Sequence, residues 1–227
     1  MEDHLRLEFN EWAKAGRGES MERGHRPVGE QAIAKMHVPD NAHVLDVGCG
    51  SGWATRLLAR KAKDGRVVGI DISDEMVRIA RETSTGYSNV EFQIASAEDL
   101  PFAADEFTHS FSMESLYYYN EVSSALREIR RVLVPNGLFV SVVDLYRENA
   151  ASHQWIEKLQ VPVQLLSIAE YCSLFTKAGF VEVRDERILD PAPILAQYTG
   201  TSFRSHKDYL EYRAAGSLMI SGRAGDE

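Results

Sequence analysis

Three glycines at alternate positions follow an acid in the run Asp46-Val47-Gly48-Cys49-Gly50-Ser51-Gly52. Glycine allows a sharp turn and lets a ligand contact bare backbone. A short apolar run, residues 43–47, precedes the glycines, and from Trp53 onward apolar residues recur at three- and four-residue steps. This order of strand, glycine loop and helix predicts a ligand site at the carboxyl end of a buried parallel strand.

The glycine spacing distinguishes between nucleotide ligands. A G-x-G-x-x-G pattern that begins at Gly48 and Gly50 needs a third glycine where Trp53 stands, and no lysine completes a phosphate-binding loop. A second acid, Asp71, ends the next apolar run, residues 66–71, where a carboxylate can accept hydrogen bonds from both hydroxyls of a ribose. The two features favour a ribose-containing ligand other than NAD. The alternative is an ordinary strand-to-helix turn that binds no nucleotide.

With these residues the chain resembles the class I S-adenosylmethionine-dependent methyltransferases of the small-molecule type, in the pattern of methyltransferase domain 11. The resemblance extends over about residues 40–187, and its other landmarks are the runs 97–102, 107–116 and 130–138. It implies S-adenosylmethionine as the cofactor. It also implies an α/β fold, a Rossmann-like doubly wound sheet of seven strands in the order 3-2-1-4-5-7-6, with strand 7 antiparallel.

The resemblance assigns roles around the cofactor. It implies that the glycines line the amino-acid portion, that Asp71 holds the ribose and that Ile72 flanks the adenine. Ala97 and Glu98 are implied at the adenine edge, and Ser96 stands where the family often has Asp, although its hydroxyl still accepts a hydrogen bond. The candidate cofactor-binding residues are Asp46, Gly48, Cys49, Gly50, Gly52, Asp71, Ile72, Met76, Ser96, Ala97, Glu98 and Met113.

Methyl transfer requires few catalytic groups from the protein, because the methyl group of a sulfonium is already activated. The protein holds the nucleophile in line with the S–C bond, excludes water and, where needed, removes a proton. No metal is required and no metal-ligand spacing occurs, so we expect no metal. We expect the segment 112–119 to contact the substrate, and the candidate catalytic residues are Tyr117, Tyr118 and His25. Alternatively, the tyrosines pack helix against sheet, and Glu114 is a base, a cap or a solvated acid.

Apolar runs and helical periodicity alternate along the chain, which predicts a parallel sheet with right-handed crossovers. The whole chain, 1–227, is expected to form one methyltransferase domain. The predicted strands are residues 43–47, 66–71, 90–95, 107–113, 137–144, 180–188 and 217–222. The predicted helices are residues 28–36, 53–63, 74–84, 121–133 and 168–178.

Three segments lie outside this pattern: residues 1–26, 145–167 and 189–214. The first is predicted to be a short helix followed by a flexible glycine-containing loop, and to act as a lid over the site. The other two are expected to be insertions that cover the active site, because long loops are usually functional or disordered. Surface elaboration without a substrate role is the alternative for all three.

Composition limits the partners. The net charge of −9 argues against nucleic acid, which needs a basic footprint. No apolar run approaches the roughly 20 residues that span a bilayer, and the first residues lack the basic and apolar regions of a signal peptide. The two cysteines suggest no disulfide framework. We therefore expect a cytoplasmic protein with a small-molecule substrate and with no nucleic-acid or membrane partner. The sequence does not predict an oligomeric state.

These observations favour an enzyme that transfers a methyl group to a small-molecule acceptor by in-line displacement. A non-catalytic S-adenosyl-binding regulatory subunit is one alternative, but such a module needs no long covering segments. A protein or RNA methyltransferase is another. The acidic charge and the absence of an Asn/Asp-Pro-Pro-Tyr-type motif after the fourth strand argue against it.

Overall fold

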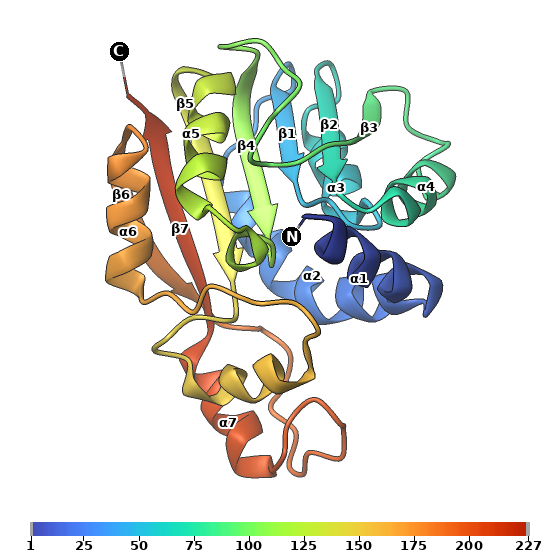
Figure 1. Ribbon diagram of the computed structural model, residues 1–227, viewed down its shortest axis with the longest axis vertical. Helices are drawn as coiled ribbons and strands as arrows, with labels where there is room; N and C mark the ends of the chain where they lie inside the picture. Colours follow the sequence, from blue (N-terminus) through green and yellow to red (C-terminus); the bar gives the residue numbers. More distant parts are fainter. Residues whose placement is uncertain (1, 226–227) are drawn as a thin grey trace.

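A seven-stranded sheet forms the centre of the protein, which is described here by a computed structural model covering residues 2–225. The strand order is β3-β2-β1-β4-β5-β7-β6, and only β7 runs antiparallel to its neighbours, so the predicted fold class and strand order are confirmed (Figure 1). The strands are β1 (His43–Val47), β2 (Arg66–Asp71), β3 (Val90–Ile94), β4 (Phe107–Met113), β5 (Leu133–Val143), β6 (Phe180–Ile188) and β7 (Ser217–Ala224).

Helices cover both faces of the sheet (Figure 1). They are α1 (Glu2–Lys14), α2 (Arg17–Lys35), α3 (Trp53–Lys61), α4 (Asp74–Thr83), α5 (Val122–Val132), α6 (Ile168–Lys177) and α7 (His206–Ala215), with 3₁₀ helices η1 (Leu116–Tyr118) and η2 (Ala150–Lys158). One apolar core joins the sheet to α5 and α6 around Phe107 and Phe139. A second joins it to α2 and α3 around Val44 and Phe111. Within residues 2–225, no helix is long and apolar enough to cross a membrane.

The fifth strand begins earlier than the sequence predicts. Residues 133–136 already belong to β5, because Leu133 pairs with Phe107 before a register shift that is followed by pairing of Leu138 with His109. Asn136 takes a left-handed conformation with φ 64°, which fits the irregularity between the two paired stretches. The carboxyl end of the strand, which matters for the site, lies close to where the sequence places it.

The N-terminal segment differs from its predicted structure. The flexible loop expected before residue 26 is helical: α1 and α2 are separated only by Ala15 and Gly16, which has φ 69°. Gly18 and Gly24 lower helix propensity, but ion pairs of Arg26 with Glu22 and Glu30 at four-residue spacing support α2 on its exposed face. The buried residues of α2, among them Val28, Ala32 and Ile33, lie after this segment, so the segment extends a helix whose later turns are fixed by packing in the second core.

Helix α1 is fixed to the start of α4 by side-chain hydrogen bonds. Asn10 Oδ1 accepts from the Ser73 hydroxyl at 2.6 Å, and Asn10 Nδ2 donates to Asp74 Oδ1 at 2.9 Å. On its inner side Phe9 packs edge-on against Tyr118 of η1, with ring centroids 5.0 Å apart. Helix α1 thus lies across the lower ends of the strands in Figure 1, where the sequence predicts a lid.

The two later segments pack on each other. Trp155 of η2 donates from its indole nitrogen to the Ser202 carbonyl at 2.9 Å, and its ring lies 5.3 Å from that of Tyr212 in α7. Both segments lie below the sheet in Figure 1. Within residues 2–225, neither 145–167 nor 189–214 lines the two cavities described below, but Tyr212 reaches the adjacent side-chain cluster.

We predict that Asn10→Ala loosens α1 and leaves the sheet intact. The change removes the acceptor for Ser73 and a donor to Asp74, so we expect local opening of α1 to become easier by about 1–3 kcal/mol. Hydrogen exchange measures it: amides of residues 2–14 should exchange faster, and S-adenosylhomocysteine should slow them again if α1 is a lid. Glu11→Ala, on the exposed face of α1, is the control. Unchanged protection of α1 in Asn10→Ala would contradict this anchoring.

Candidate cofactor and acceptor site

A cavity with about 720 Å³ of space, part of it open to solvent, lies at the carboxyl ends of β1, β2 and β4. Most of the predicted cofactor-binding residues meet in its wall, together with side chains of the N-terminal helices that the sequence did not single out. The cavity is lined by Leu5, Phe9, Met21, Gly48, Gly50, Ile70, Asp71, Ile72, Met76, Ala95, Ser96, Ala97, Glu98, Met113, Glu114, Ser115, Tyr118, Tyr119 and Asn120.

Backbone hydrogen bonds hold the glycine loop against β2. The N–H groups of Gly48 and Cys49 both donate to the Ile70 carbonyl, at 2.9 and 2.8 Å. Gly48 has φ 74°, and a Cβ added there would lie 2.5 Å from Ser115 Cβ. Both the left-handed backbone and the close approach therefore require glycine at this position.

Asp71 connects the glycine loop to the next helix. Its Oδ2 accepts from the Gly50 N–H and its Oδ1 from the Ser73 N–H, both at 2.9 Å. Burial raises the pKa of Asp71, and these backbone donors oppose the rise. The carboxylate lines the cavity, where a ribose would offer hydroxyl donors, while its backbone bonds already fix its orientation.

Two predicted cofactor residues lie beneath the loop. Asp46 is 1% exposed and accepts a hydrogen bond from the Thr55 hydroxyl at 2.6 Å, so it joins β1 to α3. Burial raises its pKa to about 7, opposed by the Thr55 hydrogen bond. Gly52 precedes α3, and a Cβ there would lie 2.8 Å from the ring of Phe92. Neither residue lines either cavity, so a direct cofactor contact for them stays a prediction.

The residues expected around the adenine surround one end of the cavity. Ile72 follows β2, and Ser96, Ala97 and Glu98 follow β3. Ser96 Oγ accepts from the Glu98 N–H at 3.1 Å, and Glu98 Oε1 accepts from the Asn120 N–H at 2.9 Å. These bonds tie the loop after β3 to the segment after η1, so both walls of the cavity are connected.

A second cavity with about 380 Å³ of space, also partly open to solvent, adjoins the first. The two share Glu114 and the glycine loop, and the predicted catalytic residue His25 lines the second one. Cys49, also predicted for the cofactor, lines this cavity as well. Its full lining is Gly18, Met21, His25, Gly48, Cys49, Gly50, Ser51, Trp53, Met76, Met113 and Glu114.

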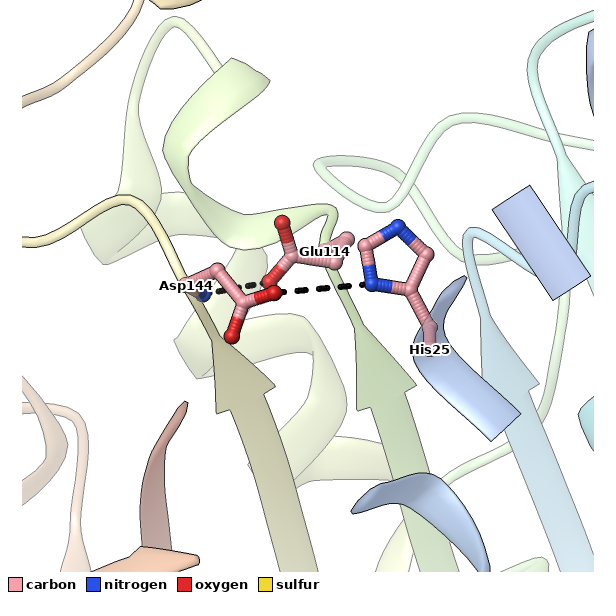
Figure 2. A group of neighbouring side chains, drawn as sticks. All are labelled: His25, Glu114 and Asp144. Carbon is pink, nitrogen blue, oxygen red and sulfur yellow. Dashed lines mark hydrogen bonds and ion pairs between the residues drawn. The ribbon is translucent and has the colours of Figure 1, made fainter. Parts of the chain in front are cut away.

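Three titratable side chains meet beside this second cavity (Figure 2). His25 comes from α2, Glu114 follows β4 and Asp144 follows β5. A ring nitrogen of His25 and one carboxylate oxygen of each acid lie within 4.8 Å of one another. His25 Nδ1 lies 3.6 Å from Asp144 Oδ2, and the Asp144 N–H donates to Glu114 Oε1. The Tyr117 hydroxyl donates to Glu114 Oε2 and the Tyr212 hydroxyl to Asp144 Oδ2, each at 2.7 Å.

The electrostatics of this cluster separate its two carboxyls. Burial and the neighbouring Asp144 charge raise the pKa of Glu114 to about 8. Burial also acts to raise the pKa of Asp144, but the hydrogen bond and charge of His25 outweigh burial and lower it. The pKa of His25 is raised because Asp144 and Glu114 outweigh the effect of burial. The pKa values of the two neighbouring carboxyls are therefore shifted in opposite directions.

The two predicted catalytic tyrosines take different places. Tyr118 lines the larger cavity and packs edge-on against Phe9, and its catalytic role stays a prediction. Tyr117 is outside both linings and instead donates to Glu114. The sequence left the role of Glu114 open between a base, a cap and a solvated acid, and it did not single out Asp144. Asp144 carried a usable signal, since it is an acid at the end of a predicted strand. Tyr212 lies in segment 189–214, which was expected to cover the site, but no pattern marks it as a partner of Asp144.

Comparison with known proteins identifies methyltransferases as relatives, in agreement with the motif and the fold. The family described as methyltransferase domain matches residues 45–141. An O-methyltransferase of Pyrenophora dematioidea is 32% identical over 172 residues, which is 71% of this chain and 62% of that protein. An O-methyltransferase of Aspergillus nomiae is 30% identical over 185 residues, 78% of this chain and 79% of that protein. This chain thus spans less than two thirds of the length of the Pyrenophora relative.

One solved structure matches almost the whole chain. It is the complex between the Haloferax volcanii Trm112 methyltransferase activator and a putative methyltransferase. The match has 35% identity and a TM-score of 0.90, and covers 96% of this chain and 98% of that one. The chain belongs to the class I S-adenosylmethionine-dependent methyltransferases. It is an S-adenosylmethionine-dependent methyltransferase of the methyltransferase domain family, and S-adenosylmethionine is its cofactor.

We predict that Asp71→Ala weakens binding of S-adenosylmethionine and S-adenosylhomocysteine alike, by about 10- to 100-fold, because a charged hydrogen-bond acceptor is lost. The ribose is common to both ligands, so both should respond equally. Calorimetric titration measures the two affinities. Glu75→Ala, an acid on α4 outside both cavities, is the control. A folded Asp71→Ala protein with unchanged affinity would place the ribose elsewhere.

Proposed function

We propose that this enzyme transfers the methyl group of S-adenosylmethionine to a small-molecule acceptor that occupies the second cavity. The observation that carries the proposal is the junction of the two cavities at Met113 and Glu114, where a group in one cavity can meet a group in the other. With the cofactor in the larger cavity, its sulfonium end near the glycine loop faces this junction. In-line displacement needs that approach.

The enclosure supports a small acceptor rather than a polymer. Side chains of α1 and α2 cover the junction: Leu5 and Phe9 lie over the larger cavity, His25 lines the smaller one and Met21 lines both. Such a cover excludes water from the reacting atoms. The net charge of −9 also argues against a nucleic-acid acceptor. A purely cofactor-binding subunit would have no use for the titratable cluster beside the second cavity.

We predict tight binding of S-adenosylmethionine and S-adenosylhomocysteine and no binding of NAD, as measured by calorimetry. We also predict that incubation with cofactor carrying a labelled methyl group transfers label to a fraction of small metabolites and not to protein or RNA fractions. The Asp71→Ala variant is the matched control. Label in the RNA or protein fraction would refute the acceptor class, and cofactor binding without transfer to any fraction would favour the non-catalytic alternative.

A Trm112-type activator is the protein partner that the comparisons support. The Haloferax volcanii structure contains a chain that matches this one over nearly its full length, in complex with the Trm112 activator. We propose that this chain binds an activator of the same type. This proposal is compatible with a small-molecule acceptor, because the activator is a protein that binds the enzyme and the acceptor is the molecule that receives the methyl group.

We predict that the purified chain and the Haloferax volcanii Trm112 protein co-elute in size-exclusion chromatography, and that the mixture has a higher unfolding temperature than the free chain. Binding to the folded state alone stabilises by mass action. An unrelated protein of similar size serves as the control. Separate elution with an unchanged unfolding temperature would remove this partner.

A further inference from the structure

Glu114 occupies a position that cofactor binding alone does not explain. It is the first residue after β4 and takes a left-handed backbone conformation with φ 55°, which is rare for a residue other than glycine. Strain of this kind persists where the surroundings enforce it, and it is concentrated at functional sites. Here the conformation places the carboxyl at the junction of the two cavities.

The surroundings fix the carboxyl in that place. Glu114 Oε2 accepts from the Tyr117 hydroxyl, and Oε1 accepts from the backbone N–H of Asp144. The two donors come from η1 and from the end of β5, so neighbouring elements hold the group from two sides. A carboxyl with this anchoring can keep its place whether or not it carries a proton.

The charges of the groups that face Glu114 can be balanced either by a proton on Glu114 or by one additional positive charge nearby. Among these described side chains only His25 can carry a positive charge, and its Nδ1 lies 3.6 Å from Asp144 Oδ2. With His25 charged, Asp144 ionised and Glu114 protonated, the cluster is neutral; with Glu114 ionised it carries one negative charge. The titratable groups that face Glu114 are Asp144 after β5, His25 in α2, Tyr117 and Tyr118 in η1, Tyr171 in α6 and Tyr212 in α7.

We propose that Glu114 exchanges its proton for the positive charge of S-adenosylmethionine and then, as the catalytic base, accepts the proton of the methyl acceptor. The proposal rests on the proposed function. In this proposal the half-buried Glu114 carboxyl keeps its proton in the free enzyme. When the cationic sulfonium occupies the adjoining cavity, the negative form of Glu114 becomes the favoured one and its proton leaves to solvent.

The reaction then balances. A lone pair of the acceptor atom forms the bond to the methyl carbon while the S–C bond breaks, and the electron pair of that bond stays on sulfur. The proton of the acceptor moves to Glu114. The sulfur of the product S-adenosylhomocysteine is uncharged, so the cluster returns to its neutral state and one proton per turnover has been released. The raised pKa of Glu114, about 8, suits a base that works near neutral pH.

Proton counting by calorimetry tests the exchange without any turnover. S-adenosylmethionine and S-adenosylhomocysteine are each titrated into the full chain at pH 7 in two buffers that differ in ionisation enthalpy. We expect release of roughly half to one proton with S-adenosylmethionine and close to none with S-adenosylhomocysteine. Glu114→Gln should bind both ligands without release. Glu121→Gln, an exposed acid outside both cavities, should behave like the wild type.

Each other result overturns the exchange. Equal proton release with the two ligands, or release retained in Glu114→Gln, assigns the proton to a different group. A change in the binding heats after removal or addition of Mg²⁺ shows instead that the cluster holds a metal ion. If neither ligand binds, the proposed function itself fails. Asp144→Asn is the second variant: removing its charge should lower the pKa of Glu114, so the proton release should fall.

Methyl transfer to the acceptor fraction found by labelling tests the base. Glu114→Gln should lower kcat by about 10²- to 10⁴-fold, with a smaller change in KM for S-adenosylmethionine. Glu114→Asp, which keeps an ionisable group, should recover part of the rate. Wild-type turnover by Glu114→Gln would exclude Glu114 as the base.

Discussion

The hydrogen bonds that tie the glycine loop to β2 determine how the rest of the site is placed. The Ile70 carbonyl accepts hydrogen bonds from two backbone N–H groups of the loop. The Asp71 carboxylate accepts one from the Gly50 N–H and one from the Ser73 N–H. The Ser73 hydroxyl in turn donates to Asn10, which positions α1. One chain of hydrogen bonds therefore runs from the cofactor loop to the helix that covers it. A cofactor bound at Asp71 would therefore lie next to the hydrogen bonds that Asp71 accepts from Gly50 and Ser73.

Local patterns predicted the parts of this molecule that depend on local sequence. The run from Asp46 to Gly52 and the acid at residue 71 predicted residues that line the larger cavity, since spacing along one strand-loop-helix unit fixes geometry. Segments around Gly18 and Gly24 were misread as a loop because ion pairs at four-residue spacing and the packed later turns of α2 outweigh the propensity of single residues. Asp46 and Gly52 belong to the motif, yet the structure places them in the packing beneath it.

The acid cluster illustrates what sequence could not supply. The hydroxyl of Tyr212 meets Asp144 across 68 residues, and His25 meets it from the opposite end of the chain. No periodicity relates these positions, and only the order of the strands brings the ends of β4 and β5 together. Placing the half-buried Glu114 carboxyl beside the buried Asp144 carboxyl opposes folding unless a proton or a cation compensates. Such an arrangement therefore points to chemistry rather than to stability.

The position of β7 has a consequence for how the protein is synthesised. This strand follows β6 in the sequence but lies between β5 and β6 in the sheet. While a ribosome is still making residues 217–224, β5 has an open edge, and β6 has no neighbour to pair with. Open strand edges promote aggregation of nascent chains. A chain interrupted before Ser217 would therefore carry the complete glycine loop and yet be a substrate for chaperones and proteases.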